Sequence, residues 1–280
     1  MYKPKVFYAS FVINTILLFV ISKYSVAQIQ YINISSGYGF GFASQSLGSN
    51  INYGVNETSN SIVKGSLGKG LITDIEFGHN WNDIISGELG ISYLRGDKYT
   101  IKNVSINNFE NNLIMNSNML RLSPKIKFTY KREKTSYYLK LGIIYKLFSR
   151  IVIDTKQNDY LNNINIEIER IFSGGNSFGL SSVIGFNKKL NNLISLYLEI
   201  ENINQSWAPK KDIVSSYFVN EMDMKSSLTP YQKQTNYSRN FEVNNNNPSK
   251  SFYARTQLIQ YFPFSSIGFK FGIQFNLKQN

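Results

Sequence analysis

The chain has 280 residues, with 30 Lys and Arg against 18 Asp and Glu, one His and no Cys. Without Cys the chain forms no disulfide, thiolate metal site or Cys nucleophile, and one His cannot supply the two or three imidazoles of a common zinc site. We therefore expect no metal site. We also expect no cofactor and no catalytic residue, for reasons that follow from the residue patterns below. Aromatic residues reach 15%, which argues against disorder.

The N-terminus has the pattern of a secretory signal peptide. Two lysines, Lys3 and Lys5, precede an apolar run from residue 6 to residue 21, and small residues stand before Gln28. This order predicts cleavage between Ala27 and Gln28, which divides the chain into a signal peptide over residues 1–27 and a mature domain over residues 28–280. Removing three lysines and no acid lowers the formal charge from +12 to +9. An uncleaved anchor is the alternative, but the run is shorter than the about 20 residues of a spanning helix.

Apolar and polar residues alternate with a period of two through the rest of the chain, which is typical of β-strands with one apolar face. In the last segment, five apolar residues from Phe269 to Leu277 alternate with Gly, Lys, Gln and Asn. Eight such segments predict eight strands. They cover residues 32–42, 67–77, 85–93, 120–130, 137–147, 178–186, 194–200 and 268–277.

Three residues disturb this pattern. Ile72 and Ile144 fall on the polar side of their segments, and Pro124 lies within the fourth segment. Proline withholds a backbone N–H from a β-ladder, so we expect Pro124 near a barrel rim or at a bulge.

The connections alternate in length. Three are tight, around residues 80–83, 132–135 and 190–192, and the other four are long and rich in Asn, Ser, Gly and Lys, over residues 43–66, 96–118, 149–176 and 208–263. Short turns at one end, long loops at the other and an even strand number are typical of an outer-membrane β-barrel. We predict an all-β fold, an eight-stranded antiparallel up-and-down transmembrane barrel with four long extracellular loops. Residues 251–261 fit either a strand extension or an arm of the fourth loop.

The polar face decides between two barrel classes. A water-soluble barrel of the lipocalin kind would have an apolar interior and a densely charged exterior. Here the polar face is rich in Gly and mixes acids and bases, which suits the narrow interior of an eight-stranded barrel, where buried charges must pair. We therefore predict a charge network in the lumen, formed by Asp74, Glu76, Glu88, Arg121, Lys125, Lys127, Lys140, Glu199, Glu201 and Lys270.

Five segments carry a family resemblance. They are GSLGKGL (65–71), ELGISYLRGDK (88–98), MLRLSPKI (119–126), NQSWAPKK (204–211) and FPFSSIGFKFGIQFNL (262–277). With them the chain resembles the small single-domain outer membrane β-barrel proteins of Bacteroidota-type Gram-negative bacteria, which are similar in architecture to OmpA- and OmpX-type barrels. The resemblance implies an eight-stranded barrel, mostly without an assigned activity. It also implies a C-terminal strand that the barrel assembly machinery reads, here Phe269, Phe271, Phe275 and Leu277, although Lys278, Gln279 and Asn280 follow where many such barrels end on an aromatic residue.

No residue pattern points to an enzyme. The single histidine, His79, is expected at the periplasmic rim, away from the outer leaflet where barrel enzymes work. We expect a monomer in the outer membrane that contacts lipid, the assembly machinery and an extracellular or envelope partner through its loops, chiefly residues 208–263, and no nucleic acid. The alternative function is a narrow channel or small-molecule transporter.

Overall fold

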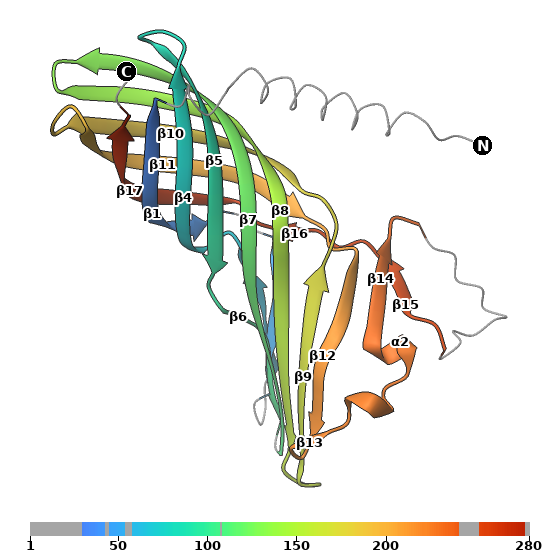
Figure 1. The fold of residues 1–280 in the computed structure, drawn as a ribbon. Helices are drawn as coiled ribbons and strands as arrows, with labels where there is room; N and C mark the ends of the chain where they lie inside the picture. The colour runs from blue at the N-terminus through green and yellow to red at the C-terminus, as the bar shows by residue number, and fades with distance from the viewer. Residues whose placement is uncertain (1–29, 43–44, 54–57, 107, 241–251, 278–280) are drawn as a thin grey trace, which may run out of the picture.

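A computed structural model describes residues 30–42, 45–53, 58–106, 108–240 and 252–277 (Figure 1). The predicted signal peptide and its cleavage site, Ala27 and Gln28, lie outside these residues. Within them the chain forms one β-sheet of 17 strands, and eight of these strands close into a ring. The ring strands are β1 (Tyr31–Gly41), β4 (Gly70–Asn80), β5 (Ile85–Gly96), β7 (Phe109–Arg132), β8 (Thr135–Asp159), β10 (Phe178–Lys189), β11 (Ile194–Trp207) and β17 (Ser266–Asn276).

The ring is antiparallel throughout and runs in the order β1-β4-β5-β7-β8-β10-β11-β17. The first and last strands close it, in a ladder that extends from Tyr31 opposite Asn276 to Gly41 opposite Ser266. Closure pairs every strand on both sides and so removes the unpaired edges of an open sheet. Each of the eight segments expected from the alternation forms one strand of this ring.

The turn lengths follow the sequence expectation at one end of the ring. The β4–β5, β7–β8 and β10–β11 turns are short, and both described chain ends, near Tyr31 and Asn276, leave at the same end. The four long connections leave at the opposite end (Figure 1).

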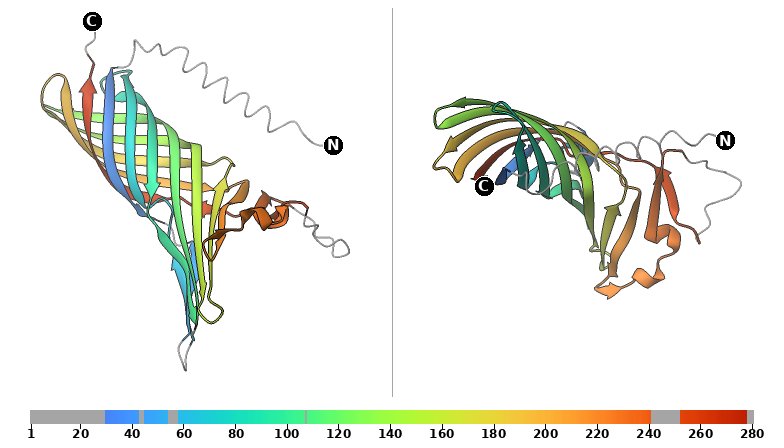
Figure 2. Two further views of the ribbon diagram at one scale, coloured as in Figure 1. Left: turned by 60° about the horizontal axis from the view of Figure 1, so that its bottom comes forward. Right: turned by 45° about the horizontal axis from the view of Figure 1, so that its top comes forward.

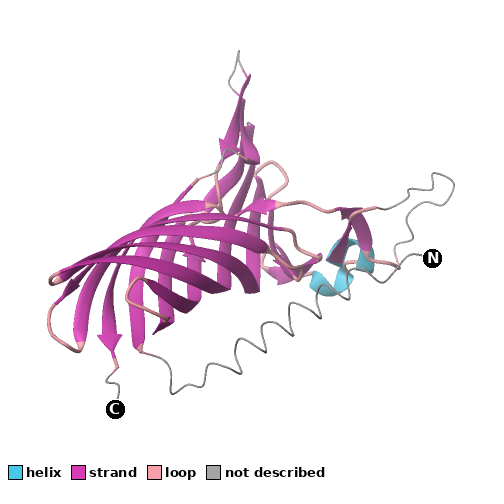
Figure 3. Cartoon of the chain, turned by 90° about the horizontal axis from the view of Figure 1, so that it is seen from above, coloured by secondary structure: helices cyan, strands magenta, loops and turns pink. Residues whose placement is uncertain are grey.

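The long connections are not the unpaired loops that we expected. They form nine further strands: β2 (Ser46–Tyr53), β3 (Thr58–Lys64), β6 (Tyr99–Ile106), β9 (Ile164–Ser173), β12 (Lys211–Val219), β13 (Met222–Asp223), β14 (Gln234–Ser238), β15 (Arg255–Leu258) and β16 (Phe262–Pro263). The two described helices, η2 (Lys225–Ser227) and α2 (Pro230–Lys233), are short and precede β14. Figure 3 shows these two helices in cyan beside the strands, which are drawn in magenta.

Most of these strands build an open sheet beyond the ring, in the order β3-β2-β6-β7-β8-β9-β12-β14-β15. We call it the extension, and it includes the outer halves of β7 and β8, residues 109–118 and 149–159. Figure 2 shows the extension leaving one side of the ring mouth. Residues 255–258 form β15 within this sheet, paired in parallel with β14, so the described residues 252–261 do not join the ring.

The alternation is more regular than the sequence suggested. Ile72 and Ile144 are buried, so they face the interior and do not break the two-residue period. The expectation for Pro124, a position near the rim or at a bulge, is wrong on both counts, because the register is the same on either side of it. Pro124 lies in the middle of the ring part of β7, and the ladder to β8 passes from Leu122 to Lys125 without pairing the two residues between them. Because proline has no N–H to donate, the ladder is interrupted there and the strand continues.

No described helix is long and apolar enough to cross a membrane.

Candidate functional site: the ring interior and its two mouths

The outer surface of the ring is apolar. Leu141, in the middle of β8, is 50% exposed, and Ile184 of β10 is 68% exposed. A water-soluble protein rarely exposes large aliphatic side chains as one continuous band. The exposed aliphatic residues of this band include Ile34, Leu71, Ile75, Leu89, Ile91, Ile126, Leu139, Leu141, Ile143, Leu180, Ile184, Leu198, Ile200 and Ile273.

Aromatic side chains gather near both ends of the band. Toward the short turns, Tyr137 packs against Phe186 with ring centroids 5.4 Å apart, and toward the long connections Tyr145 packs against Phe178 at 5.1 Å. Tyr and Trp prefer the interface between lipid and water because the ring is apolar and its edge is polar. The two aromatic levels are therefore spaced as girdles around an apolar band.

The interior of the ring is charged. Lys140 of β8 is fully buried, and its ammonium group lies 2.6 Å from Glu76, 2.7 Å from Glu88 and 2.8 Å from Glu199. These three carboxylates come from β4, β5 and β11. Lys140 therefore joins strands from opposite parts of the ring across its interior.

The other lysines extend this arrangement. Lys125 pairs with Glu76 at 2.8 Å and with Glu201 at 3.1 Å. Lys270 pairs with Asp74 at 2.6 Å, Glu201 at 2.9 Å and Glu199 at 3.4 Å, and Lys127 pairs with Glu88 at 3.3 Å. These nine residues, which we call the lumen network, are Asp74, Glu76, Glu88, Lys125, Lys127, Lys140, Glu199, Glu201 and Lys270. Their ion pairs connect β4, β5, β7, β8, β11 and β17.

Arg121, the tenth residue expected in this network, lies apart from it. Its side chain is buried, with 1% of the residue exposed, but it forms no ion pair with a described residue. It donates instead to the carbonyl oxygen of Phe264 and to the sulfur of Met119, both at 3.4 Å. Arg121 lies four residues closer to the long connections than Lys125, next to the level where the interior changes from charged to apolar.

Tyrosines and glycines fill the charged interior together. The hydroxyl of Tyr138 donates to Glu199 at 2.9 Å, and the Tyr138 ring lies 4.3 Å from the Lys127 ammonium. The same ring covers Gly185 so closely that a methyl group at this position would overlap it. Tyr31 covers Gly78 in the same way and donates to Glu88 at 2.7 Å. The glycines on the inner face thus make room for buried tyrosines.

An apolar cluster closes the interior at the end of the long connections. Trp207 and Phe264 are fully buried, with ring centroids 6.1 Å apart. The cluster consists of Leu67, Ile72, Leu94, Ile101, Met115, Met119, Ile151, Phe172, Trp207, Phe262 and Phe264. The sequence pattern did not predict it, because its members come from several connections and meet only in the folded chain. The Phe-Pro-Phe sequence of residues 262–264 was the one sequence feature that could have indicated this cluster.

Lys146 was also missed as an interior cation. It is buried near this cluster, where its ammonium group donates to the carbonyl oxygens of Gly174 and Gly175 at 3.2 Å and 2.5 Å and lies over the Trp207 ring. Both glycines have positive φ, a conformation that glycine adopts at little cost. The turn can therefore direct two carbonyl groups at one lysine.

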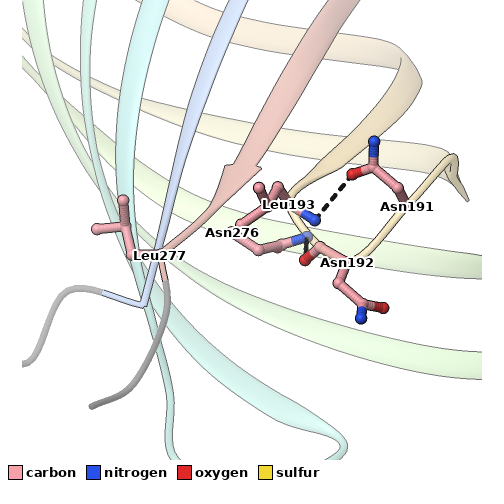
Figure 4. Close-up of a pocket in the computed structure, with 5 residues that line it drawn as sticks. All are labelled: Asn191, Asn192, Leu193, Asn276 and Leu277. Carbon is pink, nitrogen blue, oxygen red and sulfur yellow. Dashed lines mark hydrogen bonds between the residues drawn. The ribbon is translucent and has the colours of Figure 1, made fainter.

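The assembly-strand residues lie on the outside of β17. Phe269, Phe271 and Phe275 are exposed, and Leu277 follows the strand and donates its N–H to Gln30 at 2.8 Å. A hollow of about 520 Å³ lies between this strand end and the β10–β11 turn. Figure 4 shows the five residues that line it, Asn191, Asn192, Leu193, Asn276 and Leu277. Leu193 and Leu277 are half exposed there.

Within the described residues no group of three or more His, Cys, Asp or Glu side chains is arranged to hold a metal ion. The lumen carboxylates are instead joined by lysines.

No family model matches the chain, and no curated protein matches it. Among solved structures the chain is similar to the crystal structure of Neisserial surface protein A (NspA), with 8% sequence identity and a TM-score of 0.37. That alignment covers 88% of this chain and 96% of the neisserial chain.

Proposed function

We propose that the chain is an integral outer-membrane β-barrel protein without enzymatic activity, whose extension contacts partners outside the cell. The observation that carries the proposal is the polarity of the ring, with charged residues buried inside and aliphatic residues exposed outside. Burying charge while exposing hydrocarbon is unfavourable in water, but it is the arrangement that a bilayer requires of a spanning barrel.

The strand lengths support this reading. About ten tilted residues cross the hydrocarbon of a bilayer, and the outward apolar residues of β7 cover a similar length, from Leu120 to Tyr130. The whole of β7 has 24 residues and β8 has 25. At about 3.3 Å per residue each strand reaches about 80 Å, so the outer halves extend well beyond a bilayer.

The test of the membrane proposal is the state of the purified mature chain. We expect it to fold only with detergent or lipid, to migrate faster on gels before heating than after heating, and to appear in the outer-membrane fraction of the cell. Mass spectrometry of that fraction should show an N-terminus at Gln28. A monomer that is soluble in water without detergent would contradict the proposal.

A channel is the competing function. The lumen network crosses the interior with ion pairs of 2.6–3.4 Å, and the apolar cluster covers one mouth, so we expect no steady conductance in a planar bilayer. Reproducible single-channel steps would favour the channel. A variant that lacks residues 211–258 should keep the heat-dependent shift and lose any binding to cells or matrix that this part of the extension provides.

A further inference from the structure

The short-turn mouth of the ring is a polar cup with a volume of about 400 Å³. All three short turns contribute to its lining, with Asp83, Lys134 and Asn192 among the residues, and so do the two ends of the described chain, Tyr31 and Asn276. The cup is therefore the whole mouth of the ring at this end.

Lysines outnumber acids in the cup. It is lined by Lys127, Lys131, Lys134 and Lys189 and by two acids, Asp83 and Glu133. Lys131 pairs with Asp83 at 2.9 Å, on a surface where both side chains are exposed. Lys134 and Lys189 form no ion pair with any residue in the described ranges. Because Lys127 pairs with Glu88 below the cup and Lys131 pairs with Asp83, two lysines, Lys134 and Lys189, remain against one acid, Glu133, and the cup keeps a surplus of one positive charge.

The neutral part of the lining consists of amides and hydroxyls. Apart from Tyr31, every uncharged lining residue is Asn, Gln, Ser or Thr. These groups both donate and accept hydrogen bonds, so they match a ligand that carries many hydroxyl groups. No Ala, Val, Leu or Ile residue lines the cup.

The lumen network forms the floor of the cup. Lys127, which is itself buried, lines the cup and pairs with Glu88, and its ammonium group lies 5.0 Å from the centre of the Tyr31 ring. The Tyr31 hydroxyl donates to the same Glu88. The floor is therefore held by ion pairs, and a ligand that enters from the turns meets a closed end.

From these observations we infer that the short-turn cup binds a small anionic carbohydrate, through the acid group at Lys134 and Lys189 and the sugar hydroxyls at the amides. A phosphorylated sugar and a sugar carboxylic acid share this chemistry. The inference concerns a site on the side opposite the extension, and it does not depend on the partner proposed for the extension.

The experiment uses the full mature chain, folded in detergent micelles, with isothermal titration of three probes. We expect glucose 6-phosphate and glucuronate to bind and glucose to show no binding at the same concentrations. Binding of glucose 6-phosphate alone, or of glucuronate alone, would support the inference and identify the acid group. No binding of either anion, or binding of glucose as tight as that of the anions, would overturn it.

Charge variants test the location of the site. The double variant Lys134→Gln with Lys189→Gln should weaken binding by about fivefold, because two screened cations are lost. Asp83→Asn should strengthen binding by about twofold, because it releases Lys131 and removes an acid from the lining. The matched control is Lys156→Gln on the extension, whose lysine is exposed like Lys134 and Lys189 but is paired with Glu167, and it should leave binding unchanged.

All four of these side chains are exposed, so the variants should keep the heat-dependent gel shift of the folded ring. If the double lysine variant does not fold, the Asp83→Asn variant still tests the location of the site, because it should strengthen binding. Equal affinities in the parent chain, the foldable cup variants and the Lys156→Gln control would overturn the inference.

Discussion

The strands β7 and β8 pass through two regions with opposite polarity. In the ring their outward residues are apolar, such as Leu122 and Leu141, and their inward residues are charged, such as Lys125 and Lys140. In the extension the face that continues the ring interior carries Met115 and Ile153, while the opposite face carries Asp154 and Lys156. The same two strands therefore change their surroundings along their length.

The change is abrupt. On β7 it falls between Leu120 and Asn118, and on β8 it coincides with a register shift that leaves both Leu147 and Phe148 exposed. Alternate residues of a strand point to opposite faces. The outward face is apolar in the ring and polar in the extension, so the two regions suit different surroundings. In the proposed setting this level marks the outer boundary of the bilayer, with hydrocarbon on one side and water on the other.

The largest expected effect compares two lysines on β8. Lys140→Met should lower the free energy of unfolding by about 3–5 kcal/mol, because it leaves buried carboxylates without their partner. Lys156 also pairs with a glutamate, Glu167 at 2.8 Å, but its side chain is 61% exposed, and Lys156→Met should cost less than about 1 kcal/mol. Urea unfolding in detergent micelles measures both.

A second variant allows the comparison to be made if Lys140→Met does not fold. Adding Glu199→Gln to Lys140→Met removes one of the stranded charges and should recover part of the loss. Equal and small costs at Lys140 and Lys156 would show that the interior is as wet as the surface of the extension.

The next effect concerns the outward faces. Leu141→Arg should destabilise the folded ring by about 2–4 kcal/mol, the cost of a cation at the middle of the bilayer. Leu161→Arg, at the tip of the extension where the leucine is 77% exposed, should change the stability by less than about 0.5 kcal/mol. Unfolding in lipid vesicles measures the difference. If the two variants behave alike, the outside of the ring does not face lipid.

The third effect tests how the interior is packed. Gly185→Ala should cost about 1–3 kcal/mol, because the added methyl group overlaps the Tyr138 ring. In a double-mutant cycle with Tyr138→Leu, the cost of Gly185→Ala should fall, since the smaller side chain leaves room. Strictly additive costs would mean that the ring and the glycine do not constrain each other.

The smallest effect lies in the extension, at Tyr237 of β14. Its hydroxyl donates to Asp212 at 2.8 Å, and Arg170 donates to the other oxygen of Asp212 at 2.7 Å. Burial and the hydrogen bond to Asp212 raise the pKa of Tyr237 above its ordinary value. This contact favours the neutral phenol, so its stabilising effect is complete below the unfolded pKa of about 10 and is lost as the pH rises through the folded pKa.

Asp212→Asn should therefore lower the pKa of Tyr237 toward the ordinary value. The difference in ultraviolet absorbance between each protein and its Tyr237→Phe variant, followed against pH, isolates this one phenol. An unchanged titration would show that Asp212 does not hold the hydroxyl.

The ring strands could be predicted from sequence because an apolar outer surface and a charged interior impose a strict alternation along each strand. The alternation of apolar and polar residues is weaker in the extension. Its polar face meets water, and its apolar face is only partly covered. One strand was still readable: Ile164, Ile166 and Ile168 alternate with Asn165, Glu167 and Glu169 in β9. Its place among Asn-rich residues led to the expectation of a loop.

The members of the lumen network could be named because acids and bases on one face of a barrel have to share its interior. Which acid meets which lysine could not be predicted, because the pairs depend on the stagger between strands. Arg121 illustrates this limit: it shares the face of Lys125, yet the Phe262–Phe264 corner places a carbonyl group and an apolar cluster around it. That corner belongs to a connection whose path the alternation does not describe.

Closure of the ring by its first and last strands has a consequence for biogenesis. Almost the entire chain lies between β1 and β17, so this ladder is the least local contact in the fold, and contacts of this kind form slowly. Until β17 is in place, the edges of β1 and β11 are unpaired and the ring cannot close. Shortening the C-terminus into β17 should thus act as an all-or-none switch on maturation, with loss of the product and no gradual decline in its stability.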